Sequence, residues 1–572
     1  MTSSFVWQIV VVLAVILAVG YVLGIGMAAI FDGRPSWLDP VCAPIERLLL
    51  AITGVRGSPA GMTWSQYALA IVWSNFFMAV IVFGVLLFQG HLPLNPLHLP
   101  DVEPMLAFGT ACSFVTNTNW QAYSGESTLS YLSQMALTFL MFTTAGTGIV
   151  AAIAMIRGLV GRADLGNFYQ DLIRLTVRLL MPVSVVFALF LCWQGVPQTL
   201  ASSAQVRGPQ GIVQTIPRGP VASLESIKEF GTNGGGYYNA NSAHPLEGPT
   251  PLSSAVEIVL LLAIPVGVIF TFGAMLRNQR QALVVLGVMG VIYLCGLATV
   301  AWAETHGNPM LTHLGVNQAA GALSPGGNLE GKEVRFGQAL SVLFAVSTTA
   351  TMCGAVNCMH DSLTALGGFV PLGQMMLNSV FGGVGVGFMN FMLFGVLAVF
   401  LTGLMVGRTP EIFGKKVEKP EIVLASLIIL LHPLLILAPS AWSILHGYAL
   451  ASLDNRGFHG LSEILYAYSS AAANNGSAFA GLNADTPWYL LSQGFVMLLG
   501  RYLPIIAQLA IAGSLLAKRP VPVGPGTLRT DTALFGALWL AVILIVGALT
   551  FFPVMALGPI AEHFAMLAGK TF

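Results

Sequence analysis

The sequence predicts an all-α membrane protein with ten transmembrane helices, in which four tandem helix–pore loop–helix units surround a pore of pseudo-fourfold symmetry. The 572 residues are 55% hydrophobic and only 8% charged, with a mean hydropathy of +0.78, values that ordinary soluble domains do not reach. Ten apolar runs are long enough to cross a bilayer. Between them, four segments rich in small and amide residues recur at nearly constant spacing.

Each apolar run approaches or exceeds the roughly 20 residues that a membrane-spanning helix needs. The expected spans are 6–30, 66–89, 130–156, 171–194, 255–276, 281–302, 370–406, 421–438, 487–516 and 532–557. The first run begins within the leading segment MTSSFVWQIV, which has no Lys or Arg, and the stretch lacks a convincing small-residue cleavage site. We therefore expect a retained helix in place of a signal peptide.

The basic residues predict the orientation, because short cytoplasmic loops collect Lys and Arg. With the N-terminus outside, 16 of the 24 basic residues lie in inner loops, seven lie in outer loops and Arg501 lies inside a span. The outer face then has a net charge of −8 and the inner face +7. Such an outer mouth would concentrate cations. The chain as a whole is neutral, which gives no reason to expect a nucleic-acid partner.

The six cysteines show no CxxC or Cys/His spacing and are scattered through apolar stretches. They are expected to pack in the interior, without a disulfide framework or a zinc site.

The outer segments after the second, fourth, sixth and eighth spans share one organisation. Each runs from a helix-compatible stretch into uncharged small and amide residues, then returns to a span. The turning points are FVTNTNW (Asn117, Thr118, Asn119), FGTNGGGY (Thr232, Asn233, Gly234), TATMCGAVN (Met352, Cys353, Gly354) and AAANNGSAF (Asn474, Asn475, Gly476). Their first members are 115, 120 and 122 residues apart, which indicates an internal repeat.

The repeat divides the chain into six parts. These are an extra N-terminal transmembrane helix with a cytoplasmic loop (1–62), pore units 1 to 4 (63–162, 163–278, 279–419 and 420–519) and a C-terminal transmembrane helix (520–572). Non-helical backbone at membrane depth is tolerated only where protein buries it or where it lines a watery path. Four such loops around one axis would form a pore.

The turn composition favours cation binding over plain loops. Rings of backbone carbonyl oxygens can replace the hydration shell of an alkali cation, and glycine and asparagine turn the backbone at low steric cost. Any one such cluster is more often an ordinary loop, but four at matched spacing favour the pore. The first turn is the weakest match, because Asn119 stands where the others have glycine.

Several strings carry a family resemblance across nearly the whole chain. TNTNWQAYSGE, GTNGGGYYNANSAHP, MCGAVNCMHDSLTALGG, FGGVG, GRTPE and NNGSAFAGL resemble the KdpA family, the potassium-binding subunits of bacterial Kdp ATPases. The resemblance implies that K⁺ is the transported ion and that the twelve turn residues form its selectivity filter. It also implies a KdpB-like P-type ATPase subunit and KdpC-like and KdpF-like small subunits as partners, in the lipid of the bacterial inner membrane. Gln121, just past the first turn, is expected at the outer mouth.

The chain is not expected to be an enzyme itself. It contains no DKTG string, and GGNLEGKE (326–333) resembles a phosphate-binding loop but ends in Glu where Ser or Thr should bind magnesium. We therefore expect no ATP site here. No Ser/His/Asp constellation stands out, and His244 and His360 are expected to be structural or to line the mouth.

Two alternative functions are compatible with a polytopic membrane chain. A gradient-driven transporter like TrkH or KtrB would use a cytoplasmic nucleotide-binding regulatory protein, and the Kdp-like strings argue against it. A membrane-embedded enzyme with its site in the outer loops would need the missing catalytic constellation.

Two features below the filter bear on gating. The string FGGVGVGFMN places Gly382, Gly383, Gly385 and Gly387 in an apolar run, where small residues indicate either an interrupted helix on a transport path or close helix packing. In the family the helix after the third filter is broken, which favours a gate. Arg501, in LLGRYLPI, is either a snorkelling side chain or a functional intramembrane charge. TrkH and KtrB carry an arginine in the corresponding helix that obstructs the pore, which favours a barrier to leak.

Overall fold

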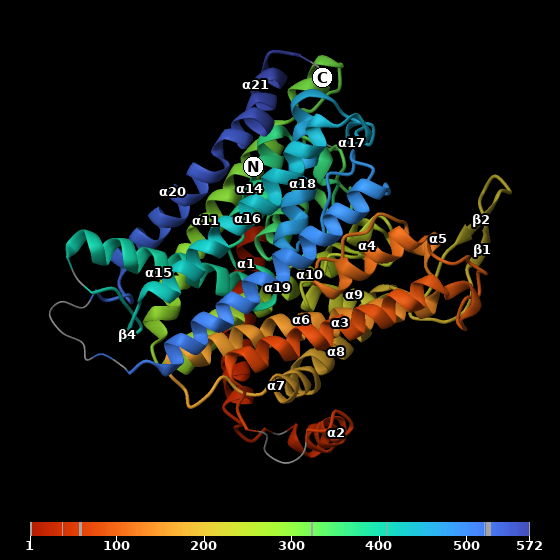
Figure 1. Cartoon of the computed structure of the whole chain (residues 1–572). Helices are drawn as coiled ribbons and strands as arrows, with labels where there is room; N and C mark the ends of the chain where they lie inside the picture. The colour runs from red at the N-terminus through yellow and green to blue at the C-terminus, as the bar shows by residue number, and fades with distance from the viewer. Residues whose placement is uncertain are drawn as a thin grey trace.

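The computed structural model describes residues 3–36, 38–55, 60–321, 324–407, 409–519, 521 and 528–570, and Figure 1 shows the course of the chain. Arg408 of the GRTPE string lies outside the described residues. Within them, ten helices or joined helix pairs are long and apolar enough to cross a membrane. This confirms the predicted all-α membrane fold with ten spans.

Most of the spans follow the apolar runs closely. They are α1 (Ser3–Phe31), α3 (Trp64–Leu87), α6 (Tyr131–Val160), α7 with α8 (Phe168–Leu175, Met181–Gln194), α10 (Pro251–Leu276), α11 with α12 (Gln279–His306, Pro309–His313), α15 (Val386–Val406), α16 (Lys419–Leu445), α19 (Pro487–Ala517) and α20 with α21 (Ala533–Met555, Ala561–Leu567). The expected last span 532–557 continues into α21. The expected span 370–406 is broken into α14 (Ala365–Leu377) and α15.

Four short helices alternate with the spans and end at the four predicted turns. They are α4 (Pro104–Val115), α9 (Val221–Phe230), α13 (Gly337–Ala350) and α18 (Gly457–Ala473). Most of their residues are buried. Smaller elements connect the rest: α2 (Asp39–Ile52), α5 (Gly125–Thr128), α17 (Gly447–Leu450) and the hairpins β1–β2 (Ala204–Arg207, Val213–Ile216) and β3–β4 (Glu411–Ile412, Lys415–Lys416).

The interior is formed by α6, α10 and α15, whose residues are mostly buried, whereas α1, α16 and α20 expose large apolar side chains. Helix α1 packs closely along α10 because both carry small residues where they cross. A methyl group on Gly24 would lie only 2.6 Å from Phe270 Cβ, and Thr271 Oγ1 donates to Gly24 O at 2.9 Å. Small residues that let backbones approach are the usual means of helix association in membranes.

The cysteines are all free thiols, but they do not all pack inside. Cys42, Cys112, Cys353 and Cys358 are buried, whereas Cys192 and Cys295 are exposed on the spans α8 and α11. The expectation of interior packing is therefore wrong for these two. A thiol is only weakly polar, so an apolar surface that faces lipid accommodates it as well as a core does.

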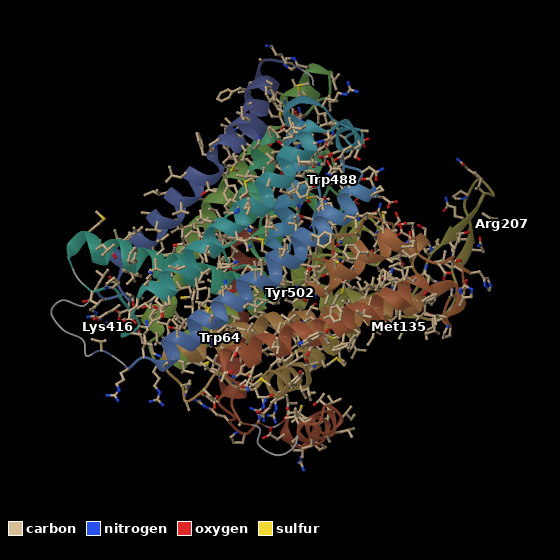
Figure 2. The ribbon with its side chains drawn as sticks, in the orientation of Figure 1. Trp64, Met135, Arg207, Lys416, Trp488 and Tyr502 are labelled. Atoms are coloured by element: carbon tan, nitrogen blue, oxygen red, sulfur yellow. The ribbon has the colours of Figure 1, made fainter. Side chains whose placement is uncertain are left out.

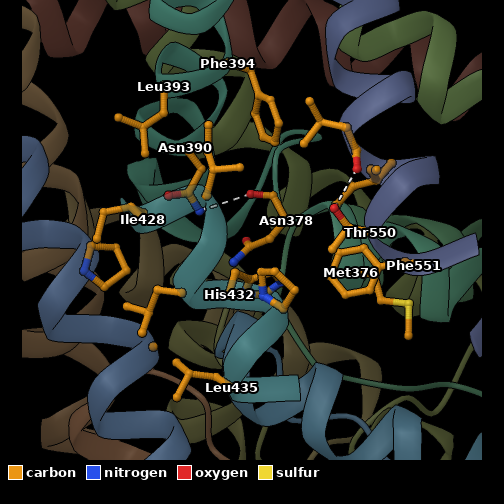
Figure 3. Close-up of a pocket in the computed structure, with 18 residues that line it drawn as sticks. Met376, Asn378, Asn390, Leu393, Phe394, Ile428, His432, Leu435, Thr550 and Phe551 are labelled. Atoms are coloured by element: carbon orange, nitrogen blue, oxygen red, sulfur yellow. Dashed lines mark hydrogen bonds between the residues drawn. The ribbon is translucent and has the colours of Figure 1, made fainter. Parts of the chain in front are cut away.

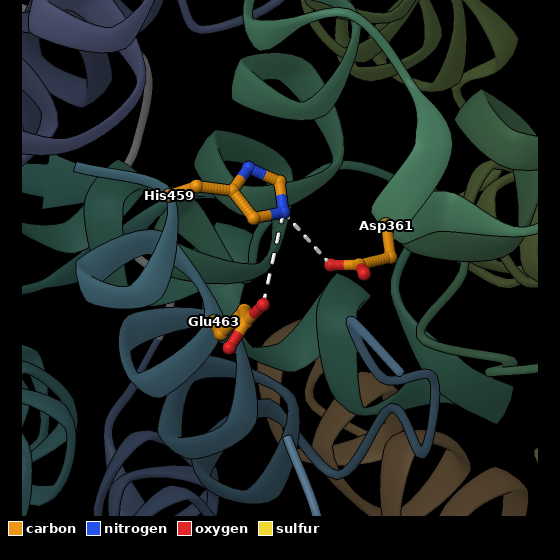
Figure 4. Close-up of side chains that lie close together, drawn as sticks. All are labelled: Asp361, His459 and Glu463. Carbon is orange, nitrogen blue, oxygen red and sulfur yellow. Dashed lines mark hydrogen bonds and ion pairs between the residues drawn. The ribbon is translucent and has the colours of Figure 1, made fainter. Parts of the chain in front are cut away.

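The two ends of the molecule carry different elements. Figure 2 shows Arg207 on the projecting β1–β2 hairpin and Lys416 of β4 at opposite ends. A cluster around His459 joins segments far apart in sequence (Figure 4). His459 Nε2 lies 3.0 Å from Asp361 Oδ1, and Nδ1 lies 2.8 Å from Glu562 Oε1. Burial favours the neutral ring, but the hydrogen bonds to Asp361 and Glu562 outweigh it and raise the pKa of His459 to about 10.

We therefore expect His459→Gln to destabilise the protein by about 1–3 kcal/mol at neutral pH, because one buried and one partly buried carboxylate lose a charged donor. A raised histidine pKa contributes stability that is complete below the unfolded value near 6.5 and is lost as pH rises through the folded value. The difference in thermal stability between wild type and variant should thus shrink toward pH 10. An equal difference at pH 6 and pH 10 would show that the ring is not charged.

Candidate functional site

The four predicted turns share one unusual backbone conformation. After each short helix the first turn residue adopts a left-handed φ: 61° at Asn117, 45° at Thr232, 51° at Met352 and 55° at Asn474. This region is sparsely populated by residues other than glycine and is strained for a β-branched residue such as Thr232. The same costly conformation at all four turns shows that their surroundings hold them in a common geometry.

Hydrogen bonds join each pore unit to both of its neighbours. They run from Asn117 Nδ2 to Thr232 O (3.0 Å), from Cys353 Sγ to Asn233 O (3.3 Å), from Asn475 Nδ2 to the α13 carbonyl Thr348 O (3.1 Å) and from Asn474 Nδ2 to Thr118 Oγ1 (3.0 Å). The four repeats therefore close into a ring in chain order. The amide side chains serve as braces between repeats, which a turn propensity alone does not predict.

The backbone carbonyls of the middle turn residues converge. A methyl group on Gly234 would lie 2.6 Å from Thr118 O, 2.8 Å from Asn475 O and 3.0 Å from Cys353 O. Carbonyl oxygens from three turns thus face the third residue of the second turn, with no room for a side chain. Carbonyl groups arranged in this way can replace the hydration shell of an alkali cation.

Glycine meets two requirements at the third turn position. A methyl group on Gly354 or Gly476 would overlap an opposing carbonyl, as at Gly234, and these two residues also have a left-handed φ. Gly354 (φ 90°) and Gly476 (φ 105°) are left-handed, and Asn119 adopts the same region at φ 57°, which explains why asparagine can replace glycine in the first turn. Gly234 has no positive φ. It must be glycine because the opposing carbonyls leave no space for a Cβ, whereas the sequence predicted a need for backbone freedom.

All four third residues, Asn119, Gly234, Gly354 and Gly476, lie at the bottom of one cavity with a volume of about 710 Å³, which we call the vestibule. Its other lining residues include Gln121, Asn239, Asn241, Glu333, Asp454 and Asp485. Gln121, which the sequence analysis expects at the outer mouth, lines this cavity and is bound to the second turn segment. Its Nε2 donates to Gly236 O at 2.8 Å, and Gly236 N donates to its Oε1 at 3.0 Å.

The two histidines singled out in the sequence lie near the vestibule as neutral groups. His360 lines it and contacts Tyr466 Oη at 2.8 Å. Burial, with a smaller effect from Lys332, lowers the pKa of His360 to about 4. His244 stacks on Tyr238 at 3.9 Å, and burial lowers its pKa as well. Neither ring therefore adds positive charge near the turns at neutral pH.

The expected seventh span is interrupted directly beside the third turn. Asn378, Phe381, Gly382, Val384 and Gly385 all have left-handed φ values, between 33° and 95°, and such residues cannot continue a right-handed helix. Gly382 N donates to Ala350 O, the last residue of α13, at 2.9 Å. Of the four glycines, Gly382, Gly383 and Gly385 lie in the break, whereas Gly387 lies within α15.

Arg501 lies next to this break. Its side chain is only 4% exposed, and its Nη2 donates to Thr144 O at 3.3 Å. Thr144 Oγ1 in turn donates to Asn117 Oδ1 in the first turn at 3.0 Å. A methyl group on Gly148, one helical turn further along α6, would lie 2.9 Å from both Arg501 Nη2 and Val384 O.

The Arg501 guanidinium, the break in the expected seventh span and the first turn therefore all lie against α6. Among the described residues, no carboxylate forms an ion pair with Arg501. An uncompensated buried cation is costly and at membrane depth usually marks a functional site.

A second, small cavity of about 50 Å³ adjoins the break (Figure 3). Asn390 Nδ2 donates to Asn378 O at 3.0 Å, and His432 and Thr550 also line the space. By volume it could hold roughly three to five water molecules. This cavity was not expected from the sequence, although Asn378, Asn390 and His432 are polar residues within apolar runs and indicate it.

Two groups of acidic side chains have a spacing that could hold a metal ion within the described part of the chain: Glu225, Glu229 and Glu257, and Asp361, His459 and Glu463. Glu225 and Glu229 of the first group form ion pairs with the ammonium of Lys228, and in the second group the His459 ring lies between Asp361 and Glu463. Each group thus already contains a cationic partner, and the uncharged carbonyls of the turns remain the better ligands for an alkali cation.

Comparisons with known proteins give one family and close relatives that match nearly the whole chain. A sequence model of the family described as "KdpA: Potassium-transporting ATPase A subunit" matches residues 10–564. The "Potassium-transporting ATPase potassium-binding subunit" of Gloeobacter violaceus is 52% identical, with 100% of both chains covered. The protein of the same name from Alicyclobacillus acidocaldarius is 50% identical over 98% of this chain and 99% of its own.

Among solved structures, the potassium transporter TrkH from Vibrio parahaemolyticus has a TM-score of 0.51 at 15% sequence identity. The alignment covers 87% of this chain and 97% of TrkH. At this identity the likeness concerns the fold alone.

The packing at Gly234 predicts that even a methyl group is not tolerated there. Gly234→Ala, and more severely Gly234→Asp, should reduce apparent K⁺ affinity and discrimination against Rb⁺ by about tenfold or more, because the carbonyls must move apart. Gly84→Ala is the matched control, since a Cβ at Gly84 meets nothing within 4 Å. Wild-type ion-dependent uptake kinetics in Gly234→Asp would contradict the assignment of this turn.

Two substitutions of Gln121 separate the effect of an added charge from the loss of its two hydrogen bonds to Gly236. Gln121→Arg should weaken apparent K⁺ affinity by roughly tenfold or more, because a fixed cation beside the turns repels an arriving cation. Gln121→Met removes the two bonds to Gly236 without adding charge, and it should weaken affinity less. Equal uptake at micromolar K⁺ by wild type and Gln121→Arg would show that the side chain does not affect the ion path.

Proposed function

Because the chain belongs to the KdpA family of potassium-transporting ATPase A subunits, we propose that it selects K⁺ at the four turns and passes it to a P-type ATPase subunit for ATP-driven import. Its close relatives are named potassium-binding subunits of the potassium-transporting ATPase, and a transporter subunit of that kind is not the catalytic ATPase. The observation that carries the proposal is the convergence of Thr118 O, Cys353 O and Asn475 O at Gly234.

Two features make this point suited to K⁺. Each of the four short helices ends at its turn, so the partly negative C-terminal ends of four helix dipoles face the same region. Asp454, Asp485 and Glu333 line the vestibule above it and favour the approach of cations. A K⁺ ion would leave its water in the vestibule and bind the turn carbonyls, with the twelve predicted residues as filter.

The region beyond the filter would prevent free leak. A K⁺ ion moving on past the turns meets the buried charge of Arg501 and the broken segment with Gly382, Gly383 and Gly385. A positive charge on a permeation path raises the barrier for cations. A pump needs that barrier, because an open pore would dissipate the gradient that ATP hydrolysis creates.

The proposed assembly is a complex in the bacterial inner membrane with a KdpB-like ATPase subunit and KdpC-like and KdpF-like small subunits. The vestibule would face the periplasm, as would the N-terminus. ATP would bind to the partner, and K⁺ would be the only ligand of this chain.

A gradient-driven transporter is the second candidate, favoured by the shared fold with TrkH. Purification from membranes distinguishes the two. We expect a large subunit carrying DKTG to co-purify and the complex to hydrolyse ATP in a K⁺-dependent way. Isolation with a soluble nucleotide-binding ring, and uptake that follows the membrane potential without ATP, would favour the second candidate.

Arg501 provides a test of the barrier. Arg501→Met, which nearly conserves volume, should leave K⁺ selectivity largely intact but increase passive K⁺ flux or loosen coupling to ATP, whereas Arg501→Lys should retain most of the barrier. The measurement is K⁺ flux in proteoliposomes with and without ATP, alongside K⁺ binding in detergent. Lost selectivity without altered leak or coupling would place Arg501 in support of the filter.

A further inference from the structure

A buried charge cluster lies behind the second turn. Lys228 of α9 is completely buried, and its Nζ lies 2.6 Å from Glu225 Oε2, 2.9 Å from Glu247 Oε2 and 3.5 Å from Glu229 Oε1. Glu257 adds a fourth buried carboxyl group, and neither of its oxygens has a hydrogen-bond partner among the described residues. One ammonium thus pairs with three of four buried carboxyl groups, and we call these five residues the Lys228 cluster.

The cluster is connected to the candidate filter by one side chain. Lys228 Nζ donates to Asn241 Oδ1 at 2.8 Å, and Asn241 Nδ2 donates to Gly234 O at 2.9 Å. Asn241 is 6% exposed and is itself held at a left-handed φ of 56°. A continuous chain of hydrogen bonds therefore runs from a buried ammonium to a turn carbonyl.

The internal repeat shows that Lys228 occupies a particular structural position. Six residues before the third turn residue, the other units carry a hydroxyl: Ser113, Thr348 and Ser470. Each of these hydroxyls binds the backbone at its own turn. Gly354 N donates to Thr348 Oγ1 at 3.0 Å, Gly476 N donates to Ser470 Oγ at 2.9 Å and Ser113 Oγ donates to Trp120 O at 3.0 Å.

The second turn has the greatest need of such a brace. Gly234 is followed by Gly235 and Gly236, so no side chain of these three residues restricts the backbone. A hydrogen bond from a charged donor is stronger than one between neutral groups, and it polarises the amide that it binds. The ammonium therefore strengthens the hold of Asn241 on the Gly234 carbonyl.

We propose that Lys228 is a positioning residue for ion selection, which acts through Asn241 to fix the direction of the Gly234 carbonyl. In the second unit it takes the place that a hydroxyl takes in the other three. The inference rests on the proposed function of the turns as a K⁺ filter. It differs from a purely structural role, in which Lys228 only neutralises the surrounding glutamates, because it predicts a change in selectivity.

The decisive variant is Asn241→Asp in the intact complex. A carboxylate at this position still accepts from Lys228 but has no hydrogen to donate to Gly234 O. Discrimination of K⁺ against Rb⁺, measured from ion-dependent ATP hydrolysis, should fall by about tenfold, in keeping with the loss of one hydrogen bond. Asn241→Ala should have the same effect without the added charge.

Two matched controls separate the proposal from simpler effects. Asn239→Asp adds the same charge to the vestibule wall, but the Asn239 side chain does not hold a turn carbonyl, so the K⁺/Rb⁺ ratio should stay within about twofold of wild type. Asn328→Ala breaks a comparable buried contact, from Asn328 Nδ2 to Glu304 Oε2 at 2.8 Å beside Lys332. It should cost stability and leave selectivity unchanged.

Lys228 itself is tested by the double change Lys228→Met with Glu225→Gln, which removes one charge of each sign and so limits the penalty of unpaired carboxylates. Reduced selectivity is expected. Wild-type K⁺/Rb⁺ discrimination in this variant or in Asn241→Asp would overturn the proposal. Gly234→Ala distinguishes that result from a failure of the filter assignment: if it also leaves selectivity unchanged, the turns themselves do not select the ion.

Discussion

The structure depends on one constraint: backbone carbonyls from three repeats must meet at a residue of the fourth, Gly234, where no side chain fits. Thr118, Cys353 and Asn475 direct their carbonyls at Gly234, and the chain accepts strained left-handed residues at the start of each turn to achieve this. Strain of this kind persists only where the surroundings over-determine it. The buried short helices and the ring of inter-turn hydrogen bonds are those surroundings.

Polar backbone at this depth must find its partners within the protein, since lipid offers none. The side chains of Asn117, Asn474 and Asn475 meet that requirement by bonding across repeats. The same amides that make the turns polar in the sequence thus hold the repeats together. Loss of one brace would affect two units at once, which couples packing to the geometry of the candidate site.

Because the four repeats are fused in a single chain, each unit can carry residues and helix breaks that the others lack. The second unit has Lys228 where the others have a hydroxyl, the third has the broken helix beside its turn and the fourth carries Arg501. A ring of four identical subunits would repeat every such feature four times. Four buried guanidinium groups or four clusters with excess carboxylates would be far more costly than one.

The sequence by itself determined the ten spans and the four turns, because apolar run length and repeat spacing are local properties that any later packing must respect. Only the tertiary structure decided why Gly234 is glycine, where 370–406 breaks and which residues brace the turns. Gln121 and Gly236 are 115 residues apart, and Lys228 reaches the Gly234 carbonyl only through Asn241. Such contacts arise when distant segments pack together, so neither composition nor periodicity contains them.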